Sequence, residues 1–206
     1  MTTDVLSEGQ ATAAGRRKIR NSQATAIVVG ALFVAGALFA ANDWLGWGRW
    51  PLGLVLGLLY SNAFEYATHR VLLHGTTGYL HRGHERHHVS WGRDDEGLYV
   101  RFGPPVAVVG LLAMNTLPLV LLDRLGAGIG GGAFIAFVAY YVLYEELHWR
   151  IHLGHLPPWL GWMRKHHFAH HRGEAGRYSV LVPLWDRVLD GGPFSKTKSQ
   201  IPNSKP

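Results

Sequence analysis

Histidine is the residue type whose number and placement most clearly predict chemistry in this sequence. The chain of 206 residues has thirteen histidines, and all of them fall within residues 69–88 and 148–171. Ten form four short motifs: His69 with His74; His84, His87 and His88; His148 with His152; and His167, His170 and His171. Imidazole is the commonest metal-binding side chain and suits iron, zinc and copper. The clustering therefore predicts a shared metal centre.

The spacing within the motifs supports this interpretation. On a helix, positions i, i+3 and i+4 share a face, so His84, His87 and His88 can point one way. His69 and His74 lie about 140° apart on an ideal helix, so they either bind different ions or straddle a helix end. Ten ligands are too many for one ion, which favours two ions with about five histidines each. A histidine-rich patch for pH sensing or anion binding is the alternative, but it does not require this spacing.

Composition excludes several other kinds of site. The chain has no cysteine, so it has no disulfide, no thiolate metal site and no nucleophilic cysteine. The formal net charge is +6. Beside long apolar runs, this charge indicates basic segments next to an anionic membrane leaflet rather than a nucleic acid partner.

The elements that must position the histidines are apolar runs long enough for membrane helices. The predicted fold class is all-α: an integral membrane protein with four transmembrane helices and a cytosolic, histidine-rich di-metal cap. Residues 24–192 form this domain, and we expect disorder in a basic N-terminal tail, 1–23, and in a C-terminal tail, 193–206. The four runs cover residues 24–41, 52–63, 105–122 and 125–147.

Charge placement predicts the orientation. Of the 20 Lys and Arg residues, all but Arg49 and Arg124 lie on the side of the membrane that holds the termini and histidines. The positive-inside rule places that side in the cytoplasm, and the Ala-, Gly- and Arg-rich composition favours a bacterial inner membrane.

Four buried helices of a soluble bundle are the alternative, but such helices should be amphipathic and these runs are apolar all round. A membrane metal-binding or transport protein would need ligands within the spans, and these runs have none at mid-depth.

The sequence resembles the membrane fatty acid hydroxylase/sterol desaturase superfamily, and within it most closely the fatty acid 2-hydroxylase branch. The resemblance extends from about Glu65 to Gly192 and agrees in the order and spacing of the histidine motifs. The matching stretches are residues 65–74, 80–88, 95–105, 144–152, 165–168 and 184–186.

This resemblance implies a lipid-hydroxylating oxygenase that uses O₂ and two metal ions, functionally iron and often zinc in purified protein. It implies a fatty acyl substrate hydroxylated at carbon 2, with a carotenoid or sterol hydroxylase or desaturase as the alternative. His166 competes with His167 for the place of the family's paired histidine. No His-Pro-Gly-Gly haem signature is present, so we expect two electrons from a separate cytochrome b5-like or ferredoxin-like donor.

Carboxylates near the motifs are candidates to orient the imidazoles by accepting their free N–H groups. Glu65, Asp95 and Glu145 are the expected residues. His81 and His155 are interpreted as supporting or surface residues.

Overall fold

The computed structural model describes residues 7–40, 49–75, 77–101 and 103–190, and over these ranges the chain is helical, with no β-strand. The predicted all-α architecture is confirmed. The elements, in chain order, are α1 (Glu8–Ala40), α2 (Trp50–Ala67), the π-helix η2 (Thr68–Leu73), α3 (Tyr79–Ser90), the 3₁₀ turn η3 (Glu96–Leu98), α4 (Pro105–Arg124), α5 (Gly130–Leu153), the 3₁₀ turn η4 (Pro158–Leu160), α6 (Gly161–His171) and α7 (Leu184–Asp190).

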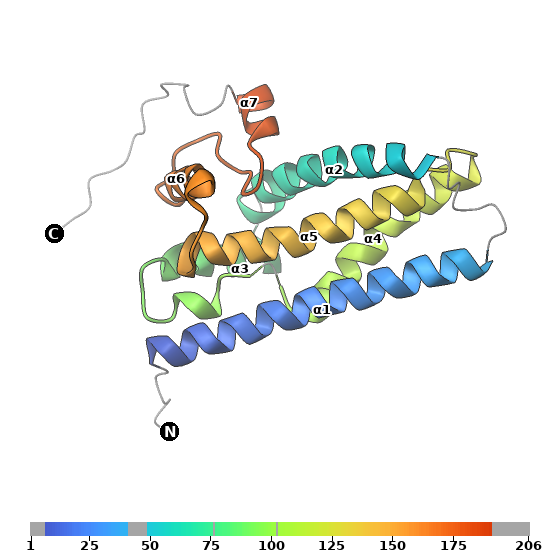
Figure 1. Ribbon diagram of the computed structural model, residues 1–206. Coiled ribbons are helices and arrows are strands. Elements are labelled where there is room, and N and C mark those ends of the chain that lie inside the picture. Colours follow the sequence, from blue (N-terminus) through green and yellow to red (C-terminus); the bar gives the residue numbers. More distant parts are fainter. Residues whose placement is uncertain (1–6, 41–48, 76, 102, 191–206) are drawn as a thin grey trace.

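Four long helices, α1, α2, α4 and α5, lie side by side, and the short helices gather at one end of them (Figure 1). Within the four apolar runs, residues 24–40, 52–63, 105–122 and 130–147 fall on these long helices. Within the described ranges one helix, α4, is by itself long and apolar enough to cross a membrane. The helices α1, α2 and α4 also carry exposed large apolar residues. Among them, Leu32, Val55 and Leu117 are each more than half exposed.

Helices α2 and α5 approach each other closely through glycine. A Cβ atom on Gly57 would lie 2.6 Å from the Ala133 Cα, and one on Gly132 would lie 2.2 Å from the Trp50 carbonyl oxygen. Real Cβ atoms do not approach other atoms this closely, so these positions require the absence of a side chain. The contact fixes α2, which leads into η2 and His69, against α5, which carries His148.

The first helix begins earlier than the sequence indicated. Residues 8–23 were predicted to belong to a disordered tail, and this prediction is wrong, because α1 starts at Glu8. Ser7 and Gln10 form a capping box: the Gln10 N–H donates to the Ser7 hydroxyl at 3.4 Å, and the Ser7 N–H donates to the Gln10 side chain at 2.9 Å. Residues 1–6 lie outside the described residues.

This first half of α1 packs on the histidine-bearing end of the molecule. Ile19 is fully buried against Val100 and Trp149. Gly15 contacts Gly97 so closely that a Cβ atom on Gly15 would overlap the Gly97 carbonyl oxygen. Arg16 forms an ion pair with Glu146 of α5 at 2.7 Å. The basic N-terminal segment is therefore part of the cap, whereas the predicted C-terminal tail, 193–206, lies outside the described residues.

The close approach of α2 and α5 gives a stability prediction. Gly57→Leu should destabilise the protein by about 1–3 kcal/mol, because the side chain overpacks a contact between two backbones. The matched control is Gly110→Leu in α4, where a Cβ atom meets nothing within 4 Å. Thermal unfolding in detergent, followed by circular dichroism, should show a lower midpoint for the first variant alone, and equal midpoints would contradict the packing argument.

Candidate metal centre

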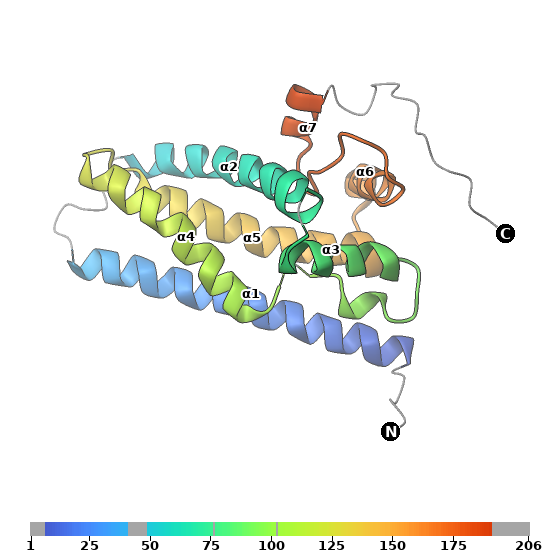
Figure 2. The same cartoon turned by 180° about the vertical axis from the view of Figure 1, so that it is seen from behind.

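Four segments far apart in the sequence bring their histidines together at the cap. They are η2 with the residue that follows it, α3, the last turns of α5, and α6, and these elements meet in both views of the fold (Figures 1 and 2). Two groups of imidazoles result. We call His69, His74, His84, His88 and His170 the first histidine group, and His87, His152, His167 and His171 the second histidine group.

The first histidine group surrounds a common point. The Nε2 atom of His84 lies 3.0 Å from that of His69, 2.9 Å from that of His74 and 2.9 Å from that of His88. The Nε2 atom of His170 lies 3.2 Å from that of His74 and 3.1 Å from that of His88. The facing atoms are all of the same kind, so the ring of contacts has no built-in alternation of donors and acceptors.

The second histidine group has the same form. The Nε2 atom of His167 lies 2.9 Å from that of His152 and 3.0 Å from that of His171, and His171 lies 3.1 Å from His87. His148 adjoins this group, because its Nε2 atom lies 3.2 Å from that of His87 and 3.1 Å from that of His167. All ten histidines singled out by their spacing therefore lie in two sets of five.

The division between the groups follows the helical repeat. In α3, His84 and His88 face the first group and His87 faces the second. In α6 the same pattern is reversed, because His167 and His171 face the second group and His170 faces the first. Each i, i+4 pair serves one group and the i+3 residue crosses to the other, so the expectation that His84, His87 and His88 point one way is wrong.

The π-helix explains how His69 and His74 reach the same group. A π-helix closes i→i+5 hydrogen bonds, and the His74 N–H donates to the His69 carbonyl at 3.2 Å. The wider turn brings residues five apart onto one face, and the two rings stack with centroids 5.2 Å apart. On an α-helix the same residues would diverge, which is why the sequence left their arrangement open.

The donor sets fit metal ions. Nitrogen ligands about 2.1 Å from an ion and at right angles to each other lie about 3.0 Å apart, which matches the observed spacing. Burial, and then the neighbouring imidazoles, lower the pKa of His87 and His167 well below the usual value, and burial lowers the pKa of His88 to about 4. The imidazoles are therefore neutral near pH 7, with lone pairs free to bind a cation.

Two outer contacts fix the orientation of these rings. The Nδ1 of His69 contacts the Tyr178 carbonyl, and the Nδ1 of His152 contacts a Glu96 carboxylate oxygen at 2.6 Å. A proton on Nδ1 donates in both contacts and leaves Nε2 as the ligand atom. The Gly92 N–H donates to the other Glu96 oxygen at 2.8 Å, so the carboxylate is held from both sides.

The carboxylates expected in this role make other contacts. Glu65 accepts hydrogen bonds from the Val180 and Leu181 N–H groups, Glu145 accepts one from the Tyr141 hydroxyl at 2.9 Å, and Asp95 pairs with Arg93 at 3.8 Å. These contacts correct the expectation, because the carboxylate that reaches an imidazole of the second histidine group is Glu96, next to Asp95. Asp95 precedes the 3₁₀ turn η3, and Glu96 opens it and turns inward. The feature of the sequence that could have indicated Glu96 is the turn-rich segment, residues 91–98, directly after the second histidine motif.

His166 and His167, which the sequence could not separate, have different surroundings. His167 belongs to the second histidine group, whereas His166 contacts Asp186 of α7 through Nε2 at 3.2 Å. Asp186 also accepts hydrogen bonds from the Tyr178 and Ser179 N–H groups at 2.8 and 3.0 Å. His166 and Asp186 thus hold the segment whose Tyr178 carbonyl meets His69.

The two remaining histidines lie outside the groups. The Nδ1 of His81 contacts the Leu73 carbonyl at 2.7 Å, at the end of η2, and His155 is exposed. Both agree with their interpretation as supporting or surface residues.

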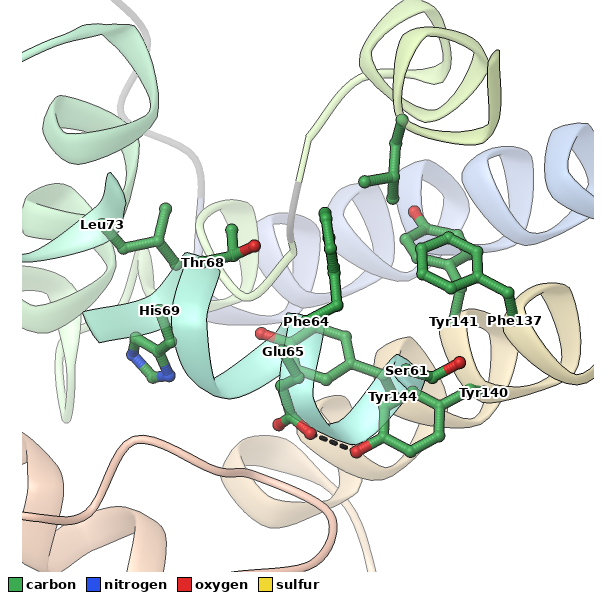
Figure 3. Close-up of a pocket in the computed structure, with 11 residues that line it drawn as sticks. Ser61, Phe64, Glu65, Thr68, His69, Leu73, Phe137, Tyr140, Tyr141 and Tyr144 are labelled. Atoms are coloured by element: carbon green, nitrogen blue, oxygen red, sulfur yellow. Dashed lines mark hydrogen bonds between the residues drawn. The ribbon is translucent and has the colours of Figure 1, made fainter. Parts of the chain in front are cut away.

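A cavity adjoins the first histidine group. It has a volume of about 60 Å³ and is lined mainly by apolar and aromatic side chains, with His69 at its border (Figure 3). Phe64 and Phe137 form part of the wall, and the Tyr140 hydroxyl donates to Glu65 beside them (Figure 3). The cavity connects the packed long helices to a candidate metal ligand.

Comparisons with known proteins agree with this chemistry. A family model described as fatty acid hydroxylase matches residues 54–191. The chain is 30% identical to the fatty acid 2-hydroxylase of Mus musculus over 144 residues, which is 64% of this chain and 37% of that protein. The corresponding protein of Rattus norvegicus is 29% identical with the same coverage. The chain therefore spans little more than a third of these relatives, and no solved structure matches it.

The contact between Glu96 and His152 gives a test of ring orientation. Glu96→Ala should lower metal affinity about 10–100-fold, because His152 loses the acceptor that holds its Nδ1 proton. Asp95→Ala is the matched control, since Asp95 lies on the surface side of the same turn. Metal content after dialysis against a chelator measures the effect, and similar retention in both variants would remove Glu96 from this role.

The surroundings of the paired histidines predict a difference between them. His167→Ala should reduce bound metal to about one ion per chain or less, because a donor atom of the second group is lost. His166→Ala should retain its metal, since that ring contacts Asp186 rather than the other imidazoles. Elemental analysis of the purified variants distinguishes them, and loss of metal in His166→Ala alone would reverse the assignment.

Proposed function

Because the chain belongs to the fatty acid hydroxylase family, we propose that it is a membrane di-iron oxygenase that hydroxylates a fatty acyl chain at carbon 2. The observation that carries this proposal is the pair of histidine groups beside an apolar cavity that reaches His69. In the reaction, one atom of O₂ enters the lipid as a hydroxyl group and the other leaves as water. A separate donor supplies two electrons, and two protons come from solvent.

The ten histidines would hold the two ions. Bound iron supplies the activation of O₂ that no side chain can provide. The chain's own residues position the reactants: Glu96 and the Tyr178 carbonyl orient two of the rings, and His69 brings the first group to the border of the cavity. Phe64, Phe137 and their neighbours offer an acyl chain an apolar wall that excludes water.

Embedding in a membrane is part of the proposal. Leu52, Val55 and Leu58 on α2 are each about half exposed, and such a row of apolar side chains suits contact with lipid. The four long helices would span the bilayer, with both termini and the histidine groups on the cytoplasmic side of a bacterial inner membrane. The names of the two rodent relatives, fatty acid 2-hydroxylases, support carbon 2 as the position.

Lipid analysis tests the activity directly. The wild-type chain, expressed in a bacterial host with a ferredoxin and its reductase, should produce acyl chains heavier by one oxygen atom. The variant His87→Ala/His170→Ala should produce none, because each group loses one donor atom. His155→Ala is the matched control and should match the wild type, since His155 is exposed and outside both groups.

Fragmentation of the products in the mass spectrometer locates the hydroxyl group. A hydroxyl elsewhere on the chain would correct the position but keep the activity, whereas products lighter by two hydrogen atoms would identify a desaturase. Unchanged acyl lipids, together with oxygenated carotenoids in a carotenoid-producing host, would replace the fatty acyl substrate with a carotenoid.

A further inference from the structure

A second hollow lies on the opposite face of α3 from the histidines. It encloses about 320 Å³ and is bordered by α1, by the outward face of α3 and by the segment that leads into α4. These three segments come together at the junction of the cap and the long helices (Figure 2). Neither histidine group contributes to it, so it is separate from the candidate metal centre.

The lining of this hollow is strongly basic. Its charged residues are Lys18, Arg82, Arg86 and Arg101, and no acidic residue borders it within the described ranges. Four cations around one hollow repel one another, and none of them forms an ion pair with a described residue. Tyr79 and Tyr99 add hydroxyl groups to the same lining. This arrangement matches an anion with several acceptor oxygens, because guanidinium groups donate two parallel hydrogen bonds to phosphate.

The position of the hollow indicates where that anion comes from. Lys18 lies six residues before the apolar run that starts at Ala24, which is about 9 Å along a helix. Pro104 borders the hollow directly before α4 begins. Both residues therefore lie at the depth of lipid headgroups, just outside the proposed spans. Leu80 and Leu98 give the hollow an apolar border, which suits an amphiphile better than a free ion.

We propose that this basic hollow, formed by Lys18, Arg82, Arg86 and Arg101, binds the phosphate group of an anionic membrane lipid. The bound headgroup reduces the repulsion among the cations and ties α1, α3 and the start of α4 together on the side of α3 away from His84 and His88. The proposal rests on the membrane placement in the proposed function but not on the hydroxylase reaction.

Lipid binding to the purified full-length chain in detergent tests the proposal. Titration with phosphatidylglycerol, followed by native mass spectrometry, should show saturable binding, and diacylglycerol with the same acyl chains should bind at least about tenfold more weakly, because it lacks the phosphate. Arg82→Gln/Arg86→Gln should lose about tenfold or more in affinity for phosphatidylglycerol. Arg82→Lys/Arg86→Lys should recover part of that affinity. Such a recovery would show that the Gln variant lost charge at the site rather than its fold.

The matched control changes the same charge at the same depth. Arg17→Gln/Arg20→Gln removes two exposed cations of α1 that do not line the hollow, and it should bind phosphatidylglycerol as the wild type does. Equal losses in both Gln variants would reduce the effect to general surface charge and overturn the site. Displacement of the lipid by inorganic phosphate at similar concentration would assign the hollow to a soluble phosphate compound instead.

A protein partner is the remaining outcome. If Arg82→Gln/Arg86→Gln leaves lipid affinity unchanged but weakens binding of an acidic ferredoxin, the basic surface docks a protein and the lipid assignment is overturned. Every readout here is a binding constant, so a chain that binds phosphatidylglycerol as expected but hydroxylates nothing would reject the proposed function and keep this inference.

Discussion

The structure depends on the gathering of ten neutral imidazoles, half of them buried, whose Nε2 atoms face one another at about hydrogen-bond distance. Lone pairs gathered in this way repel unless protons or a cation lie between them, and burial disfavours the protons because it lowers the pKa of the rings. A metal cation within each set relieves this repulsion, and the ten donors in two sets would hold two such ions. Three features position these rings: the glycine contacts of α2 with α5, the π-helix η2, and the N-terminal half of α1, which packs on the cap.

Support for the rings comes from segments outside the histidine motifs. Glu96 reaches His152 because Gly97 packs against α1, and the Tyr178 carbonyl reaches His69 because Asp186 and Glu65 hold residues 178–181 by their backbone N–H groups. The cap is therefore stabilised from both sides, by the N-terminal half of α1 and by the segment between α6 and α7. A scaffold of this kind keeps donor atoms in place before an ion arrives, which lowers the reorganisation that metal binding requires.

Much of the candidate site could be predicted from the sequence, because helical spacing alone groups the ten histidines. The assignment of each to a group could not, since it depends on how α3 and α6 face one another. The π-helix η2, which brings His69 and His74 onto one face, could not be predicted from the residue types in that segment. Glu96 was missed in favour of its neighbour Asp95 because the inward side of a short turn is decided by packing. The helical start at Ser7 and Gln10 was readable as a capping box, but the charge of the segment suggested a tail.

The alternation of α3 and α6 between the groups has a geometric consequence. In each helix, two adjacent histidines belong to different groups: His87 and His88 in α3, and His170 and His171 in α6. The distance between the two groups is therefore set by the rise and turn of an α-helix rather than by a loop. A residue inserted between the histidines of α3 or α6 would rotate every donor atom after it about the helix axis. The separation of the two histidine groups is thus a property of backbone geometry.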